Sequence, residues 1–295
     1  MINRIVVLVG LILSSTCFMM LQGQEKASRE KLRYTDKDLK DRKGDFYFYW
    51  GYNRSNYGKS DIKMEGKGYN FTLSEVRAKD MPKELSSVYF DPAQFSVPQF
   101  NIRLGFNLND KYTIAGGWDH MKYQTKNGRS AFISGSIDVS ASEKYAGTYN
   151  GEKIIMNHDE LVKMEHSDGF NVVNINIERN DFAYISKEQE LAIGIISGVG
   201  LGLAFPWTNS FVFGKRNDDR PHFSGMGSHA YMGIEGTFYK RFFLRYTVQV
   251  GFENMWDIAI TPKGDNSAHA EQTIYYFERS VVLGYRFRIG NGSFN

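Results

Sequence analysis

Alternation of apolar and polar residues is the strongest pattern in this chain. In residues 171–179, three β-branched residues alternate with Asn174, Asn176 and Glu178. Successive side chains of a strand point to opposite faces, so such a segment has one apolar and one polar face. Each segment is close to the roughly ten residues that a strand needs to cross a bilayer. Eight segments share the pattern: 45–53, 100–108, 112–123, 171–179, 191–203, 229–238, 242–253 and 275–289.

The lengths of the connections alternate as well. Residues 109–111, 180–190 and 239–241 are short links, whereas 54–99, 124–170, 204–228 and 254–274 are long ones. This order predicts an all-β, transmembrane, antiparallel up-and-down β-barrel with short periplasmic turns and long outer loops. Eight strands fit the pattern. A ten-stranded barrel is the alternative, with 69–78 and one segment of 124–170 as further spanning strands.

A soluble β-sandwich would also show alternating strands. Two features favour the barrel. Aromatic residues gather near the ends of the apolar faces, for example Trp50, Trp118, Tyr246 and Phe287, as membrane interfaces require. The opposite faces carry glycine and charges of both signs, which suits the filled interior of a small barrel.

The N-terminal segment has the layout of a secretory signal peptide. Arg4 precedes an apolar run over 5–21, and Gly23 is a small residue at a plausible cleavage site. A retained membrane anchor is the rival interpretation, but the run is short for a spanning helix. We expect a signal peptide over 1–23, a charged periplasmic tail over 24–43 and an outer-membrane barrel over 44–295.

Composition narrows the class of protein further. Aromatic residues make up 15% of the chain and glycine numbers 29, yet mean hydropathy is only −0.42. Strands that are half apolar explain this combination. The net charge of +3 is too small to indicate nucleic-acid binding. The one cysteine, Cys17, would leave with the signal peptide, which excludes a disulfide framework.

Over about residues 44–289 the chain resembles small outer-membrane β-barrels of Gram-negative bacteria, of the OmpA and lipid A deacylase size class. The stretches 118–123 and 166–171 resemble one group of such barrels that offers no activity to carry over. The resemblance implies contact with outer-membrane lipid and lipopolysaccharide and insertion by the barrel-assembly machinery. The catalytic set of the deacylases does not carry over, because His166 and Ser167 are adjacent and face opposite sides of a strand.

Charged residues of both signs fall on the inward faces near the periplasmic end. Counting from the short turns, Arg103, Arg245 and Arg286 lie at similar depth to Glu178 and Glu235. Unpaired charges would be costly there, so we expect an ion network across the lumen. Its expected role is structural, since it would fill and close the barrel.

Nearer the outer mouth the inward residues are acidic, with one imidazole. Asp119, His229, Glu253 and Glu278 lie at similar height, and the sequence places no inward arginine there. Such a group suits a weak divalent-cation site. The competing interpretation is a solvated acidic rim. No other cofactor is expected.

No phosphate-binding loop or hydrolase motif occurs in the chain. The sequence therefore favours a non-enzymatic outer-membrane barrel with a filled lumen. Its outer loops would serve ligand binding, surface interaction or membrane integrity, with any extracellular ligand unknown. A hydrolase acting on lipid or lipopolysaccharide is the alternative, and a narrow channel is the second alternative.

Overall fold

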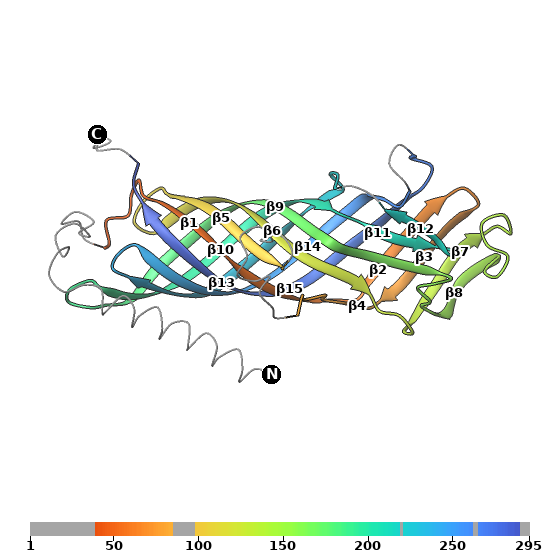
Figure 1. Cartoon of the computed structure of the whole chain (residues 1–295), viewed down its shortest axis with the longest axis horizontal. Helices are drawn as coiled ribbons and strands as arrows, with labels where there is room; N and C mark the ends of the chain where they lie inside the picture. The colour runs from red at the N-terminus through yellow and green to blue at the C-terminus, as the bar shows by residue number, and fades with distance from the viewer. Residues whose placement is uncertain (1–38, 85–97, 219–220, 262–264, 290–295) are drawn as a thin grey trace. The chain divides into compact units, whose positions relative to one another are not determined.

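The computed structural model describes residues 39–84, 98–218, 221–261 and 265–289. The predicted signal peptide and most of the predicted tail lie outside these ranges. The described residues are built from antiparallel β-strands in one connected sheet (Figure 1). They contain no helix long and apolar enough to cross a membrane.

Eight of the strands close into a ring, because the first pairs with both the second and the last. The eight correspond to the eight segments that the alternation pattern predicts. In ring order they are β1 (Phe46–Tyr57), β5 (Phe100–Asn107), β6 (Tyr112–Thr125), β9 (Val162–Ile185), β10 (Leu191–Pro206), β13 (Gly225–Phe238), β14 (Phe242–Ala259) and β15 (His269–Phe287).

The register around the ring fixes the tilt of the strands. A path of paired residues that leaves β1 at Phe46 returns to β1 at Asn56, ten residues closer to the outer end. A stagger of this kind gives a strand tilt of about 35–45° in small barrels. The path runs Phe46, Phe106, Ile114, Ile177, Val199, Ala230, Val250, Phe277, Asn56.

Exposure alternates along each ring strand as the pattern predicts. On β10, Ile193, Ile195 and Val199 are exposed, whereas Ala192 and Ile196 are buried. Large apolar side chains therefore cover the outside of the ring, and polar ones fill the inside. A closed ring satisfies every backbone hydrogen bond without water, and an apolar exterior matches hydrocarbon. The fold is a membrane-spanning β-barrel.

The outer connections are not simple loops. Seven further strands extend the sheet beyond the ring at one end of the barrel (Figure 1). These are β2 (Ser60–Gly66), β3 (Tyr69–Val76), β4 (Ala78–Lys79), β7 (Ser130–Ile137), β8 (Gly147–Ile155), β11 (Asn209–Val212) and β12 (Lys215–Asp218). The sheet runs from β15 through β2, β3 and β7 to β8, while β11 and β12 attach to β9.

The ten-stranded alternative is wrong, because its additional strands belong to the extension and not to the ring. Residues 69–78 do form strand β3 and the two-residue β4, but β3 pairs with β2 and β7 rather than with two ring strands. The ring strands themselves run further outward than the alternation predicts. β14 continues to Ala259, and β9 begins at Val162. The outer end of β9 pairs with the extension strand β11, and that of β14 pairs with β15.

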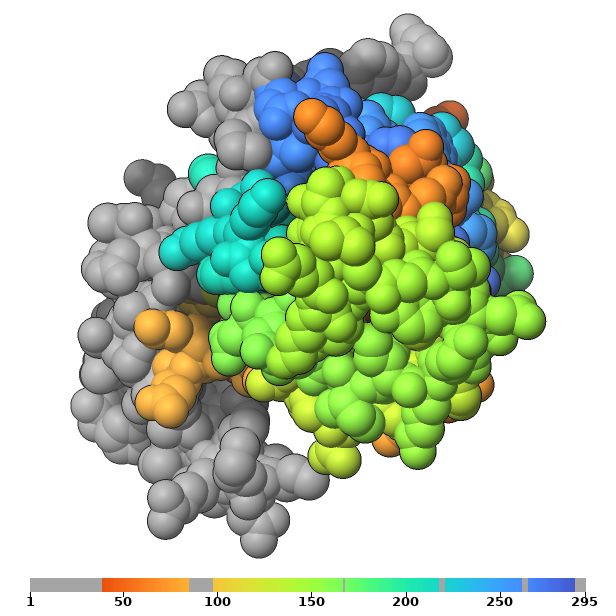
Figure 2. Space-filling model, turned by 90° about the vertical axis from the view of Figure 1, so that its right-hand side faces the viewer, coloured from red at the N-terminus to blue at the C-terminus, as the bar shows by residue number. Residues whose placement is uncertain are grey.

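A hydrophobic core fills the outer end of the barrel. We call it the outer core. Its side chains come both from the extension and from the outer ends of ring strands, and Figure 2 shows β7, β8 and the segment between them (green) lying across this end. Its largest members are almost fully buried: Ile62, Met64, Phe71, Leu73, Met121, Tyr123, Ile133, Met164, Phe170, Met255 and Ile258.

Candidate functional site

The predicted ion-network residues meet in the periplasmic half of the lumen. Arg245 lies between two carboxylates: its Nη1 is 3.2 Å from Glu178 Oε1 and its Nη2 is 2.9 Å from Glu235 Oε2. Arg286 pairs with the other oxygen of Glu235. Arg103 Nη1 lies 3.7 Å from Glu178 Oε1. We call these five residues the lower network; each is at most 3% exposed.

Aromatic rings enclose the lower network. The guanidinium of Arg245 lies 5.2 Å from the ring centres of Tyr47, Tyr49 and Phe243, and that of Arg286 lies 4.4 Å from Phe243. Tyr231 donates a hydrogen bond to Glu178 at 2.8 Å. Rings and carboxylates therefore surround the arginines on several sides and stabilise their charge in place of bulk water.

Glycines on neighbouring strands make this packing possible. A Cβ atom on Gly284 would lie 2.1 Å from Phe243 Cζ, and one on Gly105 would lie 2.2 Å from Tyr47 Cε1. Each glycine stands opposite its ring in the register. Each ring occupies the space that a side chain at the opposite glycine would fill.

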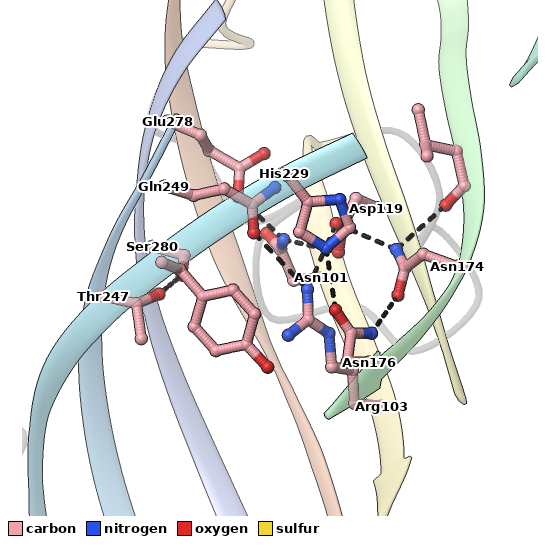
Figure 3. A network of polar contacts seen from close by, with 12 residues as sticks. Asn101, Arg103, Asp119, Asn174, Asn176, His229, Thr247, Gln249, Glu278 and Ser280 are labelled. Carbon is pink, nitrogen blue, oxygen red and sulfur yellow. Dashed lines mark hydrogen bonds and ion pairs between the residues drawn. The ribbon is translucent and has the colours of Figure 1, made fainter. Parts of the chain in front are cut away.

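A second polar layer lies outward of the lower network (Figure 3). We call it the middle layer; its members are Asn101, Asp119, Asn174, Asn176, His229, Gln249 and Glu278. Asn101 donates to Asp119 Oδ1 at 2.7 Å and to Glu278 Oε1 at 2.9 Å. Asn174 donates to Asp119 Oδ2 at 3.0 Å. Asp119 is thus the centre of the layer and is held by amides from two strands.

His229 closes the layer on the other side. Its Nε2 lies 2.7 Å from Asn176 Oδ1, and Asn176 in turn donates to Asn174 Oδ1 at 2.6 Å. A carbonyl oxygen accepts, so Nε2 carries the proton in this arrangement. The ring stacks near Tyr231, with 6.1 Å between the centroids.

The solvated acidic rim that the sequence suggests is wrong. Asp119, His229, Glu253 and Glu278 do face the lumen at similar height, but none is more than 4% exposed. The outer core covers them, because the ring strands continue past these residues into the extension. The expected absence of an inward arginine is also wrong, since Arg103 Nη2 reaches Asp119 Oδ2 at 3.3 Å.

The same four residues do not come together as one set of metal ligands within the described part of the chain. Within the described ranges, no three His, Cys, Asp or Glu side chains gather closely enough to hold a metal ion. The physical reason is the amides between them: Asn101 bridges Asp119 and Glu278, and Asn176 holds His229. Glu253 stands apart, with both carboxylate oxygens buried and without a hydrogen-bond partner in the described chain.

The described end of the predicted tail, residues 39–43, closes the periplasmic side. Arg42 is 4% exposed, and its guanidinium stacks 4.0 Å from the ring centre of Phe182. Its backbone N–H donates to Asp110 Oδ1 at 3.1 Å. Burial, and then the positive charge of Arg286, lower the pKa of Arg42 to about 9. Leu39 and Arg42 are therefore packed against the barrel, whereas Lys40 and Lys43 are exposed.

Sequence reasoning missed the amides and rings of the lumen. Asn101, Asn174 and Asn176 face inward in the predicted alternation, yet their type alone does not reveal that they bridge carboxylates. The signal that could have revealed the rings is the pairing of an aromatic residue with a glycine across neighbouring strands, as for Phe243 and Gly284.

Comparison with known proteins gives a likeness of architecture. No family model matches the chain, and no curated protein matches it. The chain is similar to the outer membrane protein OprG from Pseudomonas aeruginosa, at 10% identity and a TM-score of 0.39, over 85% of this chain and 100% of that one.

Two further solved structures show the same degree of likeness. The outer membrane protein AlkL, determined in lipid bilayers, has 9% identity and a TM-score of 0.40 over 92% of this chain and 99% of that one. Ail of Yersinia pestis, the attachment invasion locus protein, has 11% identity and a TM-score of 0.31 over 83% and 99%. These are likenesses between small barrels, and no activity follows from them.

Proposed function

We propose that this chain is an outer-membrane barrel of Gram-negative bacteria that conducts no solutes. In this proposal the barrel holds the extension, strands β2–β4, β7, β8, β11 and β12, as a rigid platform at the cell surface. The observation that carries this proposal is the outer core. Phe71, Leu73 and Ile133 from the extension are at most 1% exposed and pack with Met121 and Phe170 from the ring strands. The extension and the barrel therefore share one core.

The interior of the barrel supports the absence of transport. From the periplasmic side, a solute would meet Arg42, then the lower network, then the middle layer, and last the outer core. Each layer is bonded or packed across the lumen. Moving the lower network alone would separate buried ion pairs, which costs several kcal/mol per ion.

The orientation follows from the lengths of the connections. The β5–β6 and β13–β14 links are tight turns at one end, and the extension lies at the other. Outer-membrane barrels place short turns in the periplasm and long connections outside. This order supports an extension at the cell surface, where its strands and loops would meet ligands or neighbouring surface molecules.

The hydrolase alternative draws little support from the lumen. An acid–base pair must reach its substrate within hydrogen-bond distance. Asp119, His229, Glu253 and Glu278 lie beneath the outer core. No lipid could approach them without unfolding that core.

Electrical recording tests the proposal. We expect the purified protein, inserted in planar bilayers, to show no conductance steps at moderate voltage. The same preparation should show the gel-mobility change on boiling that marks a folded barrel. Regular open steps in the wild type would contradict the proposal in favour of a channel. A mass shift in the lipid extract of a deletion strain, absent after complementation, would contradict it in favour of a hydrolase.

A further inference from the structure

Two arginines stand side by side on the outside of the barrel. Arg54 on β1 pairs directly with Arg279 on β15 in the register. Both alternate with buried lumenal residues, Ser55 and Glu278 among them, so both face outward. Arg279 is exposed and Arg54 half-buried.

The pair lies within the apolar outer surface. Arg54 is eight residues from Phe46 and Arg279 eight from Phe287, the periplasmic ends of their strands. At ~3.3 Å per residue and a tilt of ~40°, this is about 20 Å along the barrel axis. The apolar band of such barrels is about 25 Å tall. The pair therefore faces the outer leaflet, with Phe277 and Tyr275 still above Arg279 on β15.

Two like charges directly opposite each other on a sheet are unfavourable, and a lipid-facing arginine adds a further cost. Arg279 Nη2 donates to Asn56 Oδ1 at 3.1 Å. Asn56 is two residues beyond Arg54 on β1, so this bond directs the guanidinium of Arg279 toward the outer end of β1. Arg54 Nη1 donates to Asn53 O at 2.7 Å and to Gln99 Oε1 at 3.4 Å. Asp80, which accepts from Gln99, is one acidic group near Arg54, and Arg54 makes a further contact besides these. No described carboxylate forms an ion pair with Arg279.

We propose that Arg54 and Arg279 bind the phosphate of an outer-leaflet glycolipid, the lipid A moiety of lipopolysaccharide. A phosphate between two guanidinium groups accepts charge-assisted hydrogen bonds from both and removes their mutual repulsion. The acyl chains of the same lipid then lie along the apolar wall below the pair, where Tyr52 and Val281 are opposite each other in the register. The site depends on the membrane-spanning barrel and not on the platform function.

A lipid-binding measurement tests the site. The protein is folded in neutral detergent and titrated with diphosphorylated lipid A, while native mass spectrometry counts the bound lipid. We expect Arg54→Gln with Arg279→Gln to raise the Kd at least tenfold, and Arg279→Lys, which keeps the charge, to bind within about threefold of wild type. Each variant must show the heat-dependent gel mobility of a folded barrel; the single variant Arg279→Gln serves if the double variant does not.

The control is Arg179→Gln, an outward arginine on β9 that already pairs with Asp181. We expect it to leave the affinity for lipid A unchanged. Unchanged binding by the double variant, or an equal loss in the control, would overturn the proposal. So would equally tight binding of phosphatidylcholine. Binding of inorganic phosphate at similar concentration would show a free-anion site and would overturn the lipid assignment.

Discussion

Replacing Arg245 with alanine should destabilise the barrel by about 3–5 kcal/mol. The substitution removes the guanidinium that hydrogen-bonds both Glu178 and Glu235, and it leaves Glu178 with Arg103 as its remaining cationic partner, 3.7 Å away. Breaking a buried ion pair by deleting one partner has a cost of this size, because a desolvated charge is left behind. The measurement is unfolding in urea or guanidinium in lipid vesicles, followed by tryptophan fluorescence.

Arg179→Ala is the matched control for this experiment. Arg179 also pairs with a carboxylate, Asp181, but both side chains are more than two-fifths exposed. Exposed pairs contribute about 0–1 kcal/mol, so this variant should unfold close to the wild type. An Arg245→Ala barrel that unfolds at the wild-type denaturant concentration would contradict the role assigned to the lower network.

Replacing Phe71 with alanine should loosen the extension without opening the ring. Phe71 is 1% exposed and contacts the ring of Phe213, with 5.8 Å between the centroids. Removing a buried phenyl group costs about 3–5 kcal/mol. Because proteolysis follows the population of the open state, cleavage of the extension should accelerate at least a hundredfold. The measurement is the rate of limited proteolysis of the folded protein in vesicles.

Phe132→Ala controls for the loss of a phenyl group on the neighbouring strand. Phe132 is on β7 opposite Ser74 and is 38% exposed. Its removal should change the cleavage rate only slightly, because little apolar area is returned to water. Equal cleavage of the two variants would mean that Phe71 is not part of a packed core.

The ring could be predicted from the sequence because a period of two survives in every ring strand. The same alternation placed Arg245 and Glu235 inside and Ile175 outside, and the structure has them there. Tight turns such as 239–241 supplied the direction of the chain. These features are local, so a single sequence contains them.

The extension and the burial of the acidic residues depend on pairing between distant segments. β3 and β7 are paired although about sixty residues separate them, and each has only eight residues, too few to indicate a spanning strand. Their alternation, for example Phe71 and Leu73 on one face, is present in the sequence. What the sequence lacks is the information that they lie across the barrel mouth, and so that Glu253 is buried.

Arg103 shows a further limit of counting positions along strands. In the register Arg103 is opposite Gly117, two residues from Asp119. A long side chain spans that offset, and Gly117 leaves room for it: a Cβ there would lie 2.6 Å from Arg103 Cγ. The position of the Cα atom along the strand therefore does not predict where the guanidinium of Arg103 lies.

Hydrogen–deuterium exchange in lipid discs tests most directly whether the outer connections form the extension, a folded cap on a closed barrel. The structure predicts that amides of 62–64, 71–73 and 131–133 exchange as slowly as ring amides such as those of 193–199, because both sets are paired in the sheet. Residues 265–268, which lie outside any strand, should exchange within seconds. Exchange of 71–73 and 131–133 as fast as that of 265–268 would contradict the cap and leave only flexible loops above an eight-stranded ring.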